Sequence, residues 1–125
     1  MGRVLLAEDE EALRSFLVRA LTQDGHEVVA ASDGAEALDA LTREKGAFDL
    51  LLTDIRMPIM DGIALALAAA RDYPELVILL MTGFADQRER AHGLDALVHD
   101  VITKPFTLAD IKVAVNEALA SKVRK

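Results

Sequence analysis

The sequence predicts an α/β fold in which a five-stranded parallel sheet is doubly wound, with helices on both of its faces. Short apolar runs alternate five times with segments whose apolar residues recur at helical spacing. Such alternation is typical of parallel sheets. The length of 125 residues fits one domain, and the number of strand–helix units suits the strand order 2-1-3-4-5.

Each strand is predicted from a run of apolar residues bounded by polar ones, as expected for strands that are buried on both faces. The predicted strands are residues 4–7, 28–31, 50–53, 77–81 and 97–102, and the last of them also contains His99 and Asp100. The predicted helices cover residues 12–21, 35–41, 63–71, 86–94 and 108–119. Gly25 and the pair Lys45-Gly46 are placed to end the first two helices, and Thr107 with Asp110 is placed to cap the last one.

The composition limits the classes of function. A formal net charge of −7 argues against nucleic acid as a direct partner. The absence of cysteine excludes disulfides and thiolate metal sites and favours a cytoplasmic location. No stretch is long and apolar enough to span a membrane, so we expect no membrane partner. We therefore expect one domain over residues 1–125, with no room for an output domain.

A carboxylate follows the third predicted strand. Asp54 is the first ionisable residue after the run at 50–53, and ligands of open parallel sheets bind just outside the carboxyl ends of the strands. In the order 2-1-3-4-5 the first and third strands are neighbours, so Glu8 and Asp9 are expected beside Asp54. Thr82 and Lys104 end the fourth and fifth strands at the same edge.

Three carboxylates at one spot repel each other. At an effective dielectric near 20, two unit charges about 4 Å apart cost roughly 4 kcal/mol. Mg²⁺ relieves such repulsion and keeps positions for phosphate oxygens, and the charges of three carboxylates, one lysine and one Mg²⁺ cancel. The alternative is that Glu8 and Asp9 merely start a helix, Asp54 and Thr82 belong to turns, and Lys104 is a surface lysine. Four such coincidences at one edge are less plausible than one site.

These residues also carry a family resemblance that extends over essentially the whole chain. The chain resembles the receiver domain of two-component response regulators. The matching features, each weak alone and specific in this order and spacing, are Val4-Leu5-Leu6-Ala7-Glu8-Asp9, Leu52-Thr53-Asp54, Met57-Pro58, Met60-Asp61-Gly62, Thr82-Gly83 and Lys104-Pro105-Phe106.

The resemblance implies a role for each position. Asp54 accepts a phosphoryl group from a phosphohistidine on a histidine kinase or a histidine phosphotransfer protein. Asp9, Asp54 and the backbone carbonyl of Arg56 hold Mg²⁺, and Glu8 reaches the ion directly or through water. Thr82 and Lys104 bind the phosphoryl oxygens. Such a receiver catalyses its own phosphorylation and dephosphorylation, and it is not a conventional turnover enzyme.

Two positions depart from the family pattern. Val101 stands where an aromatic residue or histidine usually couples to the threonine as a rotamer switch, and Glu8 stands where aspartate is commoner. Within the family, the chain resembles the single-domain CpdR-type receivers of alphaproteobacteria. That likeness implies output through a protein partner, namely an adaptor role for the ClpXP protease in which the unphosphorylated form is active.

Two rival functions remain. Phosphatases of the haloacid-dehalogenase type also use a strand-end aspartate with Mg²⁺, but they need a second aspartate at the position of Arg56. A degenerate receiver would act only as a binding module, which the complete set of Asp9, Asp54, Thr82 and Lys104 disfavours. We further predict a cis Lys104-Pro105 bond, and a long-lived phosphoryl group because Arg56 and Phe84 cannot orient the hydrolytic water.

Overall fold

The structure is a computed structural model that describes residues 2–83, 92–94 and 96–123. In order, the elements are β1 (Arg3–Ala7), α1 (Glu11–Gln23), β2 (Glu27–Ala31), α2 (Gly34–Arg43), β3 (Leu50–Asp54), α3 (Gly62–Asp72), β4 (Val77–Thr82), the 3₁₀ turn η1 (His92–Leu94), β5 (Asp100–Thr103) and α5 (Leu108–Val123). Strands and helices alternate as predicted from β1 to β4 and again from β5 to α5.

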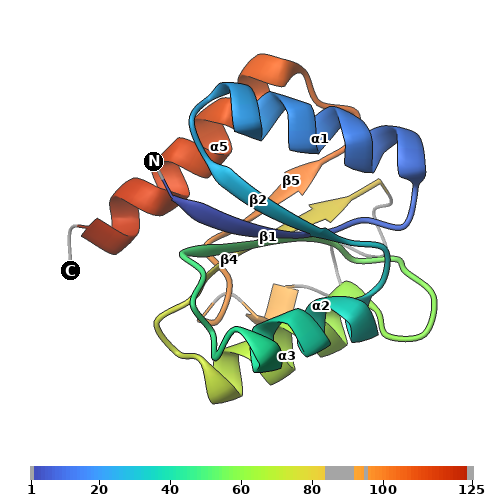
Figure 1. The fold of residues 1–125 in the computed structure, drawn as a ribbon, viewed down its shortest axis with the longest axis vertical. Coiled ribbons are helices and arrows are strands. Elements are labelled where there is room, and N and C mark those ends of the chain that lie inside the picture. Colours follow the sequence, from blue (N-terminus) through green and yellow to red (C-terminus); the bar gives the residue numbers. More distant parts are fainter. Residues whose placement is uncertain (1, 84–91, 95, 124–125) are drawn as a thin grey trace.

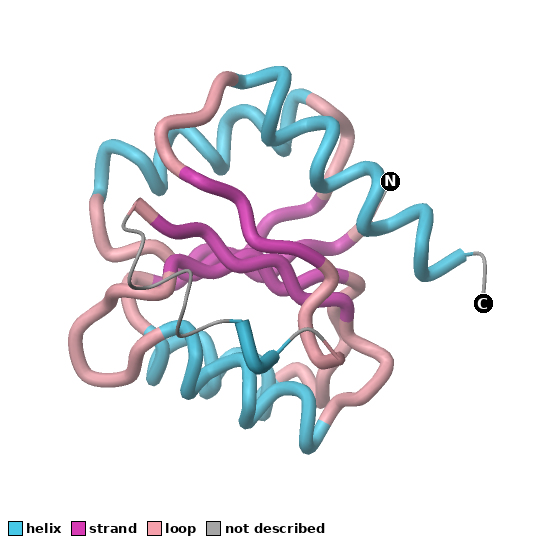
Figure 2. The backbone as a smooth tube through the Cα atoms, turned by 180° about the vertical axis from the view of Figure 1, so that it is seen from behind, coloured by secondary structure: helices cyan, strands magenta, loops and turns pink. Residues whose placement is uncertain are grey.

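The five strands form one parallel sheet in the order β2-β1-β3-β4-β5, which confirms the predicted topology. Helices α1 and α5 cover one face, and α2 and α3 cover the other (Figure 1). Figure 2 shows the same two helical layers from behind, with the sheet between them. This doubly wound arrangement leaves the carboxyl ends of the strands as an open edge.

The strand residues divide between two cores, which explains why β1 and β3 carry apolar residues at consecutive positions. Leu5 and Leu51 pack into the core on the α2–α3 side. Leu6 and Leu52 pack into the core on the α1–α5 side. All four side chains are fully buried. Because successive side chains in a strand point to opposite faces, a strand covered on both sides needs apolar residues at both.

The predicted helix ends are confirmed at the positions where local hydrogen bonding decides them. Thr107 and Asp110 form a reciprocal capping box, in which each backbone N–H donates to the other side chain at 2.9 and 3.1 Å. Gly25 has a φ of 90° after α1, and Lys45 and Gly46 have φ values of 55° and 71° after α2. The Lys104-Pro105 peptide bond is cis, as predicted.

The fifth strand is shorter than predicted, since it begins at Asp100 and not at residue 97. The backbone N–H groups of Leu97 and Val98 donate to the carbonyl oxygen of Leu94 at 2.8 and 3.0 Å. They are therefore held in a turn, and Leu97 and Val98 do not extend the sheet. Most of the helix predicted at 86–94 lies outside the described residues. The described part of that segment, residues 92–94, forms η1.

Within the part of the chain that the structure describes, no helix is both long and apolar enough to cross a membrane.

Candidate functional site

The residues predicted for the site meet at the carboxyl edge of the sheet. Asp54 is the last residue of β3, and Thr82 is the last residue of β4. Glu8 and Asp9 follow β1 directly, and Lys104 follows β5 directly. The parallel register aligns these ends, since Ala7 pairs with Thr53 and Asp54 pairs with Met81. Five residues that are up to 96 positions apart in sequence therefore share one edge.

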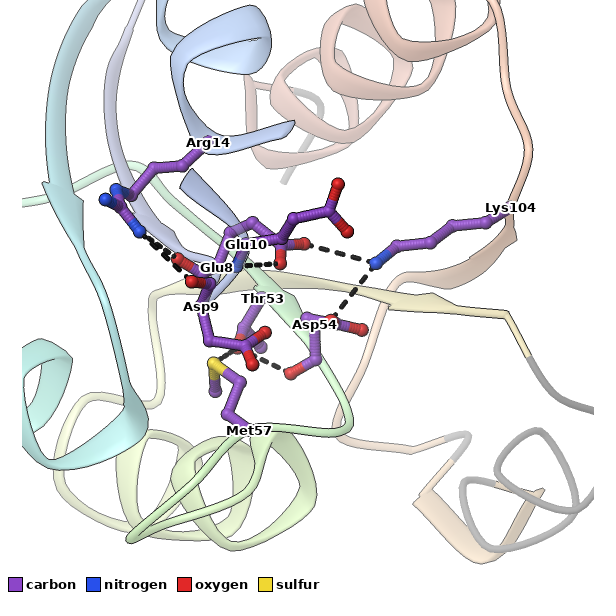
Figure 3. A network of polar contacts seen from close by, with 8 residues as sticks. All are labelled: Glu8, Asp9, Glu10, Arg14, Thr53, Asp54, Met57 and Lys104. Atoms are coloured by element: carbon purple, nitrogen blue, oxygen red, sulfur yellow. Dashed lines mark hydrogen bonds and ion pairs between the residues drawn. The ribbon is translucent and has the colours of Figure 1, made fainter. Parts of the chain in front are cut away.

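Three carboxylates gather at this edge. Glu8, Asp9 and Asp54 each offer an oxygen, and these oxygens all lie within 4.8 Å of one another. The Glu8 side chain is buried, Asp54 is 6% exposed and Asp9 is exposed. In Figure 3 the Glu8 and Asp54 carboxylates both reach the Lys104 ammonium group, while the Asp9 carboxylate has no dashed contact to it. The group has the donor set that Mg²⁺ prefers.

Lys104 is the cation of the cluster. Its Nζ donates to Asp54 Oδ2 at 3.1 Å and to Glu8 Oε1 at 3.2 Å (Figure 3). Its backbone N–H donates to the carbonyl oxygen of Thr82 at 2.7 Å, which ties the end of β5 to the end of β4. The sequence predicted a lysine in the site, and the structure adds that one ammonium group bridges two of the carboxylates.

Burial dominates the protonation of the cluster. It raises the pKa of Glu8 to about 7, and the nearby Asp54 charge adds to this rise while Lys104 and the Glu10 backbone N–H oppose it. Burial also raises the pKa of Asp54, against the opposing charge of Lys104. For Lys104, burial lowers the pKa, but the charges and hydrogen bonds of Asp54 and Glu8 outweigh burial and raise it. Among the described residues, Lys104 alone pairs with these carboxylates and does not balance their charge, so a further cation is favoured.

The loop after Asp54 is fixed by close backbone packing. A Cβ at Gly62 would lie 2.0 Å from the carbonyl oxygen of Asp54, so only glycine fits there. The Gly62 N–H donates to the carbonyl of Ile55 at 2.7 Å, and the Thr53 hydroxyl donates to the carbonyl of Asp54 at 2.9 Å. Gly62 therefore lets α3 approach the Asp54 backbone.

Arg14 is a site residue that the sequence analysis missed. Its Nη1 donates to the backbone carbonyls of Glu8 and Asp9 at 2.9 and 3.4 Å, so it holds the segment that carries both acids (Figure 3). The Glu10 N–H donates to Glu8 Oε2 at 2.9 Å in the same segment. A signal was available, since an arginine within the first two turns of a helix reaches back to the carbonyls of its N-terminal loop.

A cavity of about 670 Å³ opens above Asp54. Its lining combines the acids and Lys104 with residues of the loop after β3, namely Asp9, Glu10, Asp54, Arg56, Met57, Pro58, Gly83 and Lys104.

Val101 is half-buried against the α2–α3 core. Phe84, which is predicted to be unable to orient the hydrolytic water, lies outside the described residues.

Comparisons with known proteins agree with this geometry. A family model described as "Response regulator receiver domain" matches residues 4–116. The response regulator receiver protein CpdR of Brucella abortus (strain 2308) is 44% identical over 94% of this chain and 93% of that protein. Response regulator MprA of Mycobacterium leprae (strain TN) is 34% identical over 94% of this chain, but the match spans only 50% of that protein.

Solved structures are similar as well. A CheY-like receiver domain protein of Methanospirillum hungatei superimposes with a TM-score of 0.90 at 27% identity, covering 99% of this chain and 98% of that one. The response regulator TrrA of Thermotoga maritima, solved in complex with Mg²⁺ and BeF, gives a TM-score of 0.82 at 27% identity, with 94% and 99% of the two chains covered.

Proposed function

The chain belongs to the family of response regulator receiver domains, and from this we propose that it accepts a phosphoryl group on Asp54 from a phosphohistidine donor. The observation that carries the proposal is the position of Lys104, whose Nζ lies 3.1 Å from Asp54 and 3.2 Å from Glu8 within the carboxylate cluster. A nucleophile, a phosphate-binding cation and a metal-binding set of oxygens then share one cavity, as phosphoryl transfer requires.

Receiver domains bind Mg²⁺ in an acidic pocket, and the residues present here fit that ion. Three carboxylates supply hard oxygen ligands within 4.8 Å of one another, and they carry more negative charge than Lys104 balances. We assign the ion to Asp9, Asp54 and the backbone carbonyl of Arg56, with Glu8 in direct or water-mediated contact. Bound Mg²⁺ supplies positive charge next to the transferred group.

The chemical step is a single displacement at phosphorus. A carboxylate oxygen of Asp54 forms the new P–O bond while the P–N bond to the donor imidazole breaks, and the imidazole nitrogen keeps the electron pair and takes up a proton. Lys104 Nζ pairs with the phosphoryl oxygens, and the hydroxyl of Thr82 donates a hydrogen bond to one of them. These residues contribute positioning and electrostatic stabilisation. The chain is itself the acceptor, so no separate substrate turns over.

We propose that the phosphorylated and unphosphorylated forms differ in their binding of a protein partner. The similarity to CpdR of Brucella abortus over nearly the full length of both chains supports a single-domain receiver of that type. For this chain we propose an adaptor role for the ClpXP protease, with the unphosphorylated form active. A histidine kinase or histidine phosphotransfer protein is the proposed donor, and the cytoplasm is the proposed location.

Incubation with acetyl phosphate and Mg²⁺ tests the proposal by intact mass. Wild type is expected to gain one phosphate that hydroxylamine removes, since acyl phosphates are labile to it. Asp54→Asn is expected to gain none. Steady turnover of phosphate esters would instead indicate a phosphatase, and an unmodified wild type would indicate a receiver that acts only as a binding module.

A further inference from the structure

Ile59 adopts a backbone conformation that isoleucine rarely takes. Its φ is 71°, and the N–H of Met60 donates to the carbonyl oxygen of Pro58 at 2.7 Å across it. These two features describe a γ-turn with a positive central φ, which is a rare and strained turn. A β-branched residue at positive φ is a true outlier, because its Cβ crowds the backbone.

Burial in the folded protein does not offset the backbone strain at Ile59. The Ile59 side chain is 83% exposed, more than any other large apolar side chain in the described part of the chain. A buried isoleucine could offset backbone strain by removing apolar surface from water, but this one leaves its surface in water. Glycine or asparagine would fit the same conformation at lower cost. Stability of the isolated domain therefore does not account for isoleucine at this position.

The residues that directly follow Ile59 are held by packing against α2 and by the start of α3. A Cβ at Gly34, the first residue of α2, would lie 2.2 Å from the carbonyl oxygen of Met60, so α2 abuts the loop. Asp61 caps α3 by accepting from the Ala64 N–H at 2.8 Å. Strained backbone persists only where its surroundings fix it in this way. The isoleucine side chain is therefore presented to solvent from a fixed position, which lowers the entropy lost when a partner binds it.

The position of this fixed side chain identifies what binds it. Arg56, Met57 and Pro58 line the cavity above Asp54, and Ile59 is the next residue along the same loop. A protein that delivers a phosphoryl group into this cavity must cover the cavity rim. We propose that Ile59 is an apolar anchor for the protein that carries the phosphohistidine, an inference that rests on the proposed function.

Loss of the Ile59 anchor should affect phosphoryl transfer from a protein donor and not from a small-molecule donor. Acetyl phosphate fits inside a cavity of about 670 Å³ and has no need of the rim. A donor protein buries Ile59 at the contact, and burial of an isoleucine side chain is worth roughly tenfold to a hundredfold in affinity. The reacting atoms stay the same, so loss of the anchor should raise the KM for the donor protein and leave the maximal transfer rate unchanged.

The test compares Ile59→Gly, Ile59→Asn and Ile59→Leu with wild type. Histidine kinases encoded in the same genome are autophosphorylated with radiolabelled ATP, and the one that transfers fastest to wild type serves as donor. Ile59→Gly and Ile59→Asn are expected to raise the KM for this donor about tenfold or more. Ile59→Leu, which keeps an apolar side chain, is expected to stay within about threefold of wild type. Val113→Ala, at an exposed apolar residue of α5, is the control and is expected to behave as wild type.

Two further measurements separate docking from folding and from the chemistry. Ile59→Gly is expected to have a higher urea midpoint than wild type, because glycine relieves the strain, and to react with acetyl phosphate at the wild-type rate. Wild-type KM values in both Ile59→Gly and Ile59→Asn would overturn the docking proposal alone. A wild type that accepts acetyl phosphate but no kinase phosphate would overturn the docking proposal together with the proposed phosphohistidine donor, while phosphoryl acceptance on Asp54 would stand. Failure of wild type with every donor would overturn the proposed function as well.

Discussion

Replacement of Glu8 with glutamine should stabilise the metal-free protein at alkaline pH. Burial raises the pKa of Glu8 from 4.5 to about 7, so the folded state holds this proton more tightly than the unfolded state. The free energy of unfolding should therefore fall as pH rises from about 4.5 to 7, and the loss should be complete above pH 7. Each pKa unit corresponds to about 1.4 kcal/mol, so the loss is about 3 kcal/mol.

Glutamine removes the charge and keeps a carbonyl oxygen that accepts one hydrogen bond, either from the Glu10 N–H or from Lys104. The gain for Glu8→Gln in EDTA should therefore approach, but not exceed, about 3 kcal/mol at pH 8.5, and it should be small at pH 5. With a urea dependence of about 2 kcal/mol per molar, the midpoint should rise by up to about 1.5 M at pH 8.5. Glu75→Gln, at an exposed residue, is the matched control.

Urea unfolding in EDTA at several pH values between 5 and 8.5 measures this difference. If the midpoints of Glu8→Gln and wild type differ by the same amount at every pH, Glu8 does not titrate in the buried environment described here. Added Mg²⁺ gives a second check. The ion competes with protons for the carboxylates. Added Mg²⁺ should therefore stabilise wild type more than Glu8→Gln at pH 8.5, and it should stabilise wild type much less at pH 5 than at pH 8.5.

Three further changes have expected outcomes. Asp54→Asn removes one of three crowded charges, so it should raise the urea midpoint in EDTA. The same change should abolish phosphorylation by acetyl phosphate. A urea midpoint below that of wild type would mean that Asp54 is a structural residue. Gly62→Ala forces a Cβ to within 2.0 Å of the Asp54 carbonyl and should destabilise the protein by about 1–3 kcal/mol, and an unchanged midpoint would mean that the loop yields freely. Arg56→Asn combined with Phe84→Glu should speed phosphate loss about tenfold, since both new side chains can orient water. If the double variant loses phosphate at the wild-type rate in a radiolabel chase, positions 56 and 84 do not control the lifetime of the phosphoryl group.

Features of the site that depend on strand order could be predicted from the sequence. Asp54, Glu8 and Asp9 follow apolar runs, and the topology that alternation implies brings their strands together. The Thr107–Asp110 capping box could also be predicted, because both partners lie within one turn. Local pattern and fold rules suffice where the deciding contacts are local or follow from strand order.

Features that depend on the approach of distant backbones could not be predicted. The sequence showed a glycine at position 34, but not that α2 abuts the carbonyl of Met60. It showed Ile59 in a loop, but not that its φ is positive. The start of β5 was placed too early, because the carbonyl of Leu94 binds the N–H groups of Leu97 and Val98. Tertiary packing decides each of these, and neither hydrophobic period nor propensity encodes it.

The combined binding of Mg²⁺ and beryllofluoride tests the central claim most directly, namely that the carboxylates and Lys104 form a metal-dependent phosphoryl site. A ligand that binds only the native state stabilises it by about 2.7 kcal/mol at a hundredfold excess over its dissociation constant. Thermal unfolding in millimolar Mg²⁺ with beryllofluoride should therefore occur several degrees higher than in EDTA, and Asp54→Asn should show a smaller rise. Identical unfolding temperatures for wild type in the two conditions would contradict the account.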